Sequence, residues 1–156
     1  MKRLALLAFV LSIGVAVCTN PSNLAAAQNS QKAKGADKTA VDTKQDKGIG
    51  PIKSVTLGPI DKKLAEKGKS QFEEKCMSCH QLDSRLVGPP LEYSTRDYSP
   101  EFIMNMILNS TVMESKDPVA KALLDKYHVP MIVPGVTKEQ ARAILEFLRT
   151  KAPKKK

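Results

Sequence analysis

Aromatic residues are scarce in this sequence. Its 156 residues include four Phe, three Tyr and no Trp, and no aromatic residue occurs between Phe9 and Phe72. Aromatic side chains bury more area than most others in a small core, so the first third of the chain contributes little to one. The length allows one small folded domain with accessory segments.

Acidic residues are also outnumbered. The chain has 25 Lys and Arg against 16 Asp and Glu, a formal charge of +9 at pH 7. Nucleic-acid sites interleave basic with aromatic residues, whereas these lysines are spread along the chain. We therefore expect no nucleic-acid partner, and the surplus of lysine suits transient docking to proteins with acidic surfaces.

Histidine and cysteine are few, yet three of them come together. The chain has two His and three Cys, and two of the cysteines precede a histidine in Cys76-Met77-Ser78-Cys79-His80. C-x-x-C-H is the attachment sequence of a c-type haem. Cysteines three apart share a helix face and can reach the two vinyl groups on one porphyrin edge, while the next residue presents an imidazole to the iron. A haem would also supply the bulk that aromatic residues do not.

Two other chemistries share parts of this motif. A thioredoxin-like dithiol uses C-x-x-C near a βαβ pattern, but the sequence has no parallel-strand signature. A structural zinc site could use Cys76, Cys79, His80 and His128, but adjacent ligands fit a tetrahedral site poorly and there is no second C-x-x-C. Haem attachment is favoured over both.

The N-terminus has the pattern of an export signal. Lys2 and Arg3 precede an uncharged, mostly apolar run of 14 residues, Leu4 to Val17. An ordinary membrane span needs about 20 apolar residues, so this run is too short for one. We expect an exported, periplasmic protein.

The sequence allows two cleavage positions for the signal. Cleavage after Ala25-Ala26-Ala27 would define a signal of residues 1–27 and discard Cys18. Alternatively, the sequence before Cys18 resembles a bacterial lipoprotein box, in which Cys18 becomes a lipidated first residue that tethers the protein to a membrane. Val17 departs from that pattern, which prefers Gly, Ala or Ser before the cysteine.

Composition and capping signals divide the rest of the chain. Residues 28–60 are polar, with no apolar period, and predict a flexible linker; residues 61–151 form the domain and 152–156 a basic tail. Helix starts in the domain are marked by a capping residue or a capping box at Asp61, Ser99, Asp117 and Thr137.

One glycine and two proline-rich stretches stand out within the domain. Gly68 lies inside the first helix, where it costs about 1 kcal/mol relative to Ala, so we expect close approach of another helix. Gly88-Pro89-Pro90 cannot continue a helix and folds the chain back past the motif. A proline carbonyl there could accept a hydrogen bond from the His80 ring, although a purely structural turn is the simpler interpretation. The second stretch, residues 128–135, prevents regular helix before the last one.

In this order of elements, residues 61–151 resemble a single-haem class I cytochrome c of the exported bacterial type. The resemblance implies an all-α fold of about four to five helices around one covalently bound haem c. It implies thioether bonds from Cys76 and Cys79, His80 as proximal iron ligand, and Pro89 as acceptor for the His80 ring.

The resemblance also implies a distal ligand and a helix crossing. Met131 would be the distal ligand, and His128, three residues earlier, is the alternative. In the family the first and last helices cross closely, which would place Gly68 and Phe72 against Phe147.

The implied function is one-electron transfer between respiratory complexes or exported reductases, by a monomer that is not an enzyme. A haem enzyme or gas sensor, with an open or His128-ligated distal side, is the alternative.

Overall fold

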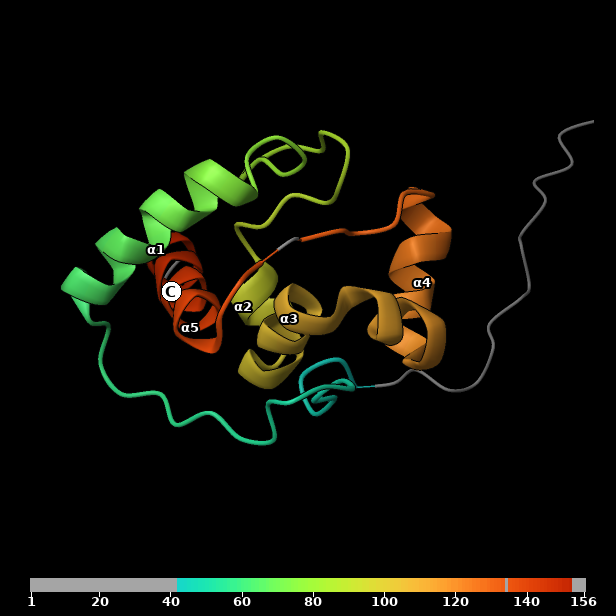
Figure 1. Ribbon diagram of the computed structural model, residues 1–156, viewed down its shortest axis with the longest axis horizontal. Helices are drawn as coiled ribbons and strands as arrows, with labels where there is room; N and C mark the ends of the chain where they lie inside the picture. The colour runs from blue at the N-terminus through green and yellow to red at the C-terminus, as the bar shows by residue number, and fades with distance from the viewer. Residues whose placement is uncertain (1–41, 134, 153–156) are drawn as a thin grey trace, which may run out of the picture. The chain divides into compact units, whose positions relative to one another are not determined.

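A computed structural model of the chain describes residues 42–133 and 135–152. These residues form five α-helices and no strand (Figure 1): α1 (Lys62–Lys75), α2 (Ser94–Asp97), α3 (Pro100–Lys116), α4 (Pro118–Tyr127) and α5 (Lys138–Lys151). The prediction of an all-α fold is confirmed. The predicted export signal, Cys18 and residues 153–156 of the basic tail lie outside the described residues.

The four predicted helix starts are where the capping signals indicate. Asp61 accepts a hydrogen bond from the N–H of Leu64, and Ser99 accepts one from Phe102. Asp117 caps α4, and Thr137 forms a capping box with its partner three residues on. These side chains satisfy backbone N–H groups that have no partner inside the helix. The short α2 has no side-chain cap and was not predicted.

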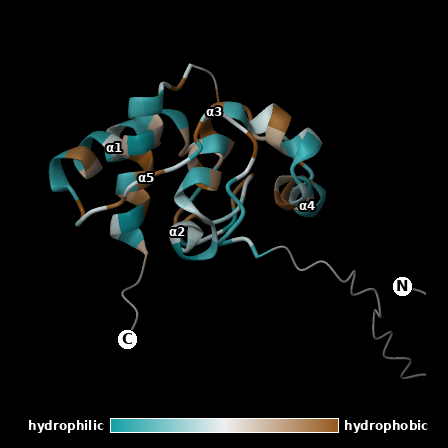
Figure 2. Cartoon of the chain, turned by 90° about the horizontal axis from the view of Figure 1, so that it is seen from below, coloured by the Kyte–Doolittle hydropathy of each residue, from teal (hydrophilic) through white to brown (hydrophobic). Residues whose placement is uncertain are grey.

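Helices α1 and α5 cross in close contact, and both views show α1 lying across α5 (Figures 1 and 2). A Cβ added to Gly68 would overlap the backbone carbonyl of Ala143 on α5. One turn further along α1, the ring centroids of Phe72 and Phe147 lie 5.2 Å apart. The helix crossing implied by the resemblance is therefore confirmed, and Gly68 is required by it.

A buried carboxylate ties the start of α1 to α5. Glu146 is fully buried and accepts hydrogen bonds from Arg142, from Arg149 and from the backbone N–H of Asp61. Desolvation opposes ionisation of this carboxyl, but these hydrogen bonds outweigh it and hold the pKa of Glu146 below its usual value. Arg149 also donates to the carbonyl of Gly58, so the same group fixes the chain before α1.

The predicted flexible linker is wrong for its described part. Residues between Thr43 and Val55 are hydrogen-bonded to α2 and α3, and Ile52 is 8% exposed in the core. Val55 N–H donates to Glu101, Asn105 bonds both the N–H and the carbonyl of Ile52, and Asn109 donates to the Ile49 carbonyl. The segment is held through its backbone atoms, which bond to side chains of α3. Its own side chains therefore need no regular apolar pattern, and these contacts leave no sign in the sequence. Residues 28–41 lie outside the described part.

Helix α3 packs against both α4 and α5 and is not continuous. Its backbone leaves helical geometry at Asn109, where φ is −151° and ψ is 36°. Residues before this kink contribute Ile103 and Ile107 to the cluster shared with α5, while Met113 after it is fully buried against α4 residues. No helix in the described ranges is long and apolar enough to cross a membrane.

Replacing Gly68 by alanine should destabilise the domain. The new Cβ would meet backbone rather than a movable side chain, so α1 and α5 would have to separate, at a cost of about 1–3 kcal/mol. Denaturant unfolding of the haem-loaded protein, followed by helical circular dichroism, measures this change. Gly58→Ala is the matched control because no atom lies within 4 Å of its added Cβ. Equal midpoints for the two variants would contradict the crossing.

Candidate functional site

The C-x-x-C-H motif forms one hydrogen-bonded turn directly after α1. The N–H of Cys76 donates to Phe72 at 2.8 Å, and the N–H groups of Cys79 and His80 both donate to the carbonyl of Cys76, at 3.1 and 2.9 Å. The turn confirms that one short stretch of backbone carries both thiols and the imidazole. Because it continues from α1, its position follows from the contact of α1 with α5.

The two cysteines are free and lie in different surroundings. Cys76 is buried in the apolar cluster that contains Phe72 and Phe147, whereas Cys79 is exposed. Burial raises the pKa of the Cys76 thiol to about 11, so this thiol is protonated at neutral pH. Two unpaired thiols on one turn suit attachment of an apolar group that lies partly in the core and partly at the surface.

The imidazole of His80 is buried and oriented by the turn that follows it. His80 is 8% exposed, and its Nδ1 lies 2.9 Å from the carbonyl oxygen of Pro89. A carbonyl can only accept, so Nδ1 carries the proton and the lone pair of Nε2 is left for a metal. The hydrogen bond to Pro89 is the one that the resemblance implied.

Sequence reasoning treated Gly88 only as part of a turn. A Cβ at this position would overlap Cε1 of His80 and lie 2.8 Å from Nδ1. The N–H of Gly88 also donates to the Cys79 carbonyl at 2.8 Å. The backbone of Gly88 therefore lies flat against the ring, and a glycine directly before a proline pair was the available signal.

The chain folds back along the motif after this turn, as predicted. Leu91 N–H donates to the Gln81 carbonyl at 3.1 Å and Glu92 N–H to the Leu82 carbonyl at 2.8 Å. Leu82 and Leu91 are half-buried against the same cluster as Cys76. The segment after the motif thus joins the apolar surroundings of the thiols.

The loop between α4 and α5 carries the two candidate distal ligands in different positions. Met131 is half-buried against the cluster that contains Cys76, and its N–H donates to Glu114 at 2.7 Å. His128 is exposed, ends α4 in the left-handed conformation with φ of 60°, and donates its N–H to Leu124. The structure therefore places Met131, and not His128, against the apolar cluster that contains Cys76.

These residues fit a covalently attached haem. Large apolar side chains are exposed in the segment after α1 and in the loop between α4 and α5, with accessible fractions between 39% and 77%. Such exposure is typical of residues that cover a bound group or partner. These residues are Met77, Leu86, Val87, Val129 and Ile132. A zinc site is not supported, because no three His, Cys, Asp or Glu side chains within the described ranges group as metal ligands.

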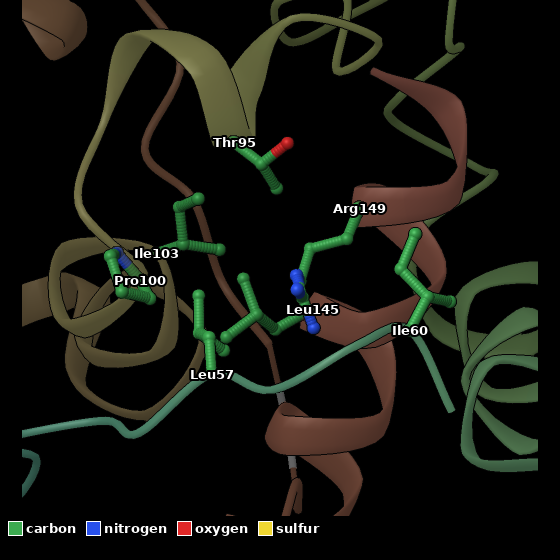
Figure 3. Close-up of a pocket in the computed structure, with 7 residues that line it drawn as sticks. All are labelled: Leu57, Ile60, Thr95, Pro100, Ile103, Leu145 and Arg149. Carbon is green, nitrogen blue, oxygen red and sulfur yellow. The ribbon is translucent and has the colours of Figure 1, made fainter. Parts of the chain in front are cut away.

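A pocket elsewhere in the domain contains none of the predicted site residues. Figure 3 shows it between residues of the 42–60 segment, α2, α3 and α5. Its volume is about 200 Å³. The guanidinium of Arg149 is its one charged group, and that group already bonds Glu146 and the Gly58 carbonyl. The rest of the lining is apolar apart from the hydroxyl of Thr95, so the pocket has none of the groups that would bind a metal or a haem.

The comparisons with known proteins agree with this site. A protein-family model described as cytochrome c matches residues 65–152. No curated protein sequence matches the chain.

Solved structures of cytochrome c from Rhodothermus marinus are similar to this chain. One is a cytochrome c, 44% identical with a TM-score of 0.65, and the match covers 66% of this chain and 90% of that one. An engineered form is 43% identical with a TM-score of 0.64, and the coverage is again 66% and 90%. The engineered form bound to a carbene intermediate is also 43% identical, with a TM-score of 0.62 and the same coverage.

Alanine at position 88 should disturb the imidazole. Its Cβ would push the His80 ring away from Pro89, and an imidazole without that hydrogen bond is a weaker donor to iron, so the reduction potential should rise. The unfolding free energy should also fall by about 1–3 kcal/mol. Potentiometry and denaturant unfolding of haem-loaded Gly88→Ala measure both effects, with Gly58→Ala as control. An unchanged potential would refute the role given to Gly88.

Proposed function

The chain belongs to the cytochrome c family and is a haem-binding electron carrier, and from this premise we propose that it carries single electrons between respiratory complexes or exported reductases. Its covalently bound haem c supplies the chemistry, since the iron alternates between Fe(III) and Fe(II). This role needs no bond to be made or broken in a substrate, so we propose that the chain is not itself an enzyme.

The observation that carries the site assignment is the buried His80 ring held by Pro89. Cys76 and Cys79 would hold the haem through thioether bonds, and His80 would bind the iron through Nε2. Pro89 fixes the ring and its tautomer, which also increases the basicity of Nε2. The turn that carries these residues and the hydrogen bond that orients His80 are both formed in the structure.

Met131 is our candidate for the second axial ligand. Its half-buried position against the cluster that contains Cys76 supports this role, and the exposed position of His128 at the end of α4 argues against the alternative. A thioether donor with apolar neighbours disfavours the extra positive charge of the oxidised state. We therefore propose a comparatively high reduction potential.

A spectrum of the oxidised protein tests the distal ligand. Methionine ligation gives a weak sulfur-to-iron charge-transfer band near the red end of the visible range. We expect Met131→Ala to abolish this band and to lower the reduction potential, because Met raises it. His128→Ala, three residues away on the same loop, should leave both unchanged. A band that survives in Met131→Ala would refute the assignment.

A haem enzyme or gas sensor is the second candidate function. An engineered relative has been solved with a carbene intermediate bound, so a reactive species can be held on that related protein. In this chain an enzyme would need an open distal side, and His128 would be the acid-base group nearest to Met131 in the sequence. Absence of the charge-transfer band in the unmodified protein would favour this candidate.

The proposed partners are redox proteins with acidic docking surfaces. In the described domain, lysines are exposed on several helices: Lys62, Lys63, Lys67 and Lys69 on α1, Lys121 and Lys126 on α4, and Lys138 and Lys151 on α5. Spread positive charge raises the rate of encounter with an acidic partner without requiring tight binding. Such docking suits a carrier that must release each partner, and we propose that it acts as a monomer.

We also propose that the protein is exported to the periplasm. The support is the pattern of residues 1–27. Mass spectrometry of the mature N-terminus, with labelled fatty acid in the medium, separates the two processing routes. A mature chain that begins at Gln28 without label means ordinary cleavage, whereas label that disappears in Cys18→Ala means a lipoprotein. Unprocessed protein retained in the cytoplasm would contradict export.

A further inference from the structure

The loop that carries Met131 is anchored by a side chain from another helix. The backbone N–H of Met131 donates to Oε1 of Glu114, 17 residues earlier, at 2.7 Å. Pro130, directly before Met131, has no N–H to donate. In residues 129–133, 135 and 136, no other backbone N–H donates a hydrogen bond to a residue that the structure describes. The bond to Glu114 is therefore the polar restraint on this loop.

The position of Glu114 is itself well defined. It follows Met113, which is fully buried, and it lies after the kink in α3 at Asn109. Three residues further on, Asp117 is buried and caps α4, so Glu114 lies between two buried residues. Because Glu114 belongs to a packed helix, a hydrogen bond to it restricts the movement of the loop that carries Met131.

Glu114 has no competing ionic partner in the described part of the chain. No lysine or arginine there forms an ion pair with it. Hydrogen bonds from a backbone N–H to a carboxylate are charge-assisted and stronger than those between neutral groups. Among the described residues, the carboxylate of Glu114 therefore bonds the amide of Met131 and no basic side chain.

We propose that Glu114 is a positioning residue for the distal ligand, which holds the backbone of Met131 so that its thioether stays at the iron. The inference rests on the proposed ligation by Met131. Without the acceptor at position 114, the loop can move away, the thioether is bound for a smaller fraction of the time, and an external ligand can take its place. Outer-shell partners of metal ligands have effects of about 10- to 100-fold when they are removed.

Glu114→Ala and Glu114→Gln separate positioning from charge in the haem-loaded protein. Glutamine keeps an acceptor oxygen at nearly the same place but removes the negative charge. We expect Glu114→Ala to weaken the charge-transfer band, to lower the reduction potential and to bind added imidazole about tenfold more tightly or better. Glu114→Gln should keep the band and bind imidazole like the unmodified protein. Loss of the charge alone would raise the potential, which is the opposite direction.

Matched controls make the result specific. Ser115→Ala changes the next, exposed residue of α3 and should have no effect. In a Met131→Ala background, Glu114→Ala should no longer change the affinity for imidazole, because there is no thioether left to position. If Glu114→Ala yields no loaded protein, Glu114→Asp takes its place, since it withdraws the carboxylate by one methylene.

The outcomes also separate this inference from the ligand assignment. A charge-transfer band that is absent from the unmodified protein, or that survives in Met131→Ala, would refute ligation by Met131 itself. If Met131→Ala abolishes the band while Glu114→Ala leaves both the band and the imidazole affinity unchanged, Met131 is the ligand and the role of Glu114 is refuted. An equal loss of the band in Glu114→Ala and Glu114→Gln would likewise overturn positioning through the acceptor oxygen.

Discussion

The contact between α1 and α5 at Gly68 determines where the residues proposed for haem attachment lie. Because Gly68 has no Cβ, the two backbones meet, and Phe72 one turn later packs on Phe147. Such aromatic pairs contribute about 0.5–1.5 kcal/mol beyond their buried area. Cys76 follows after another turn and lies in the same cluster. The crossing of two helices thus places the Cys76 thiol in the core, and the rest of the motif follows in a single turn.

Helix α3 organises the other half of the domain through polar side chains. Glu101, Asn105 and Asn109 are four residues apart and share one face of the helix, where they bond the backbone of residues 42–60. Asn105 is completely buried, and its amide donates to two carbonyls while its oxygen accepts from Ile52. A buried amide with all these partners stabilises one arrangement of the segment, because any shift would leave its polar atoms unpaired.

Much of the fold and the near side of the site could be predicted from the sequence because the signals are local. A helix cap can be recognised from four consecutive residues, and the five residues of C-x-x-C-H form a turn through hydrogen bonds among themselves and to Phe72. The segment 42–60 could not be predicted, because its contacts depend on Asn105 and its neighbours, which look like ordinary polar residues of a surface helix. The roles of Gly88 and Glu114 depend likewise on which ring or amide the fold brings beside them.

The same difference separates the two sides of the site. The near side is local: attachment, the imidazole and its hydrogen-bond acceptor all lie between Cys76 and Pro89. The far side depends on distant parts of the chain. Ile49 bonds Asn109 and Met113, and the next residue, Glu114, holds the amide of Met131. Contacts through α3 thus connect the segment before α1 to the loop that carries Met131. The residues proposed for haem attachment are therefore held by local contacts, whereas the proposed distal ligand is held by contacts between distant parts of the chain.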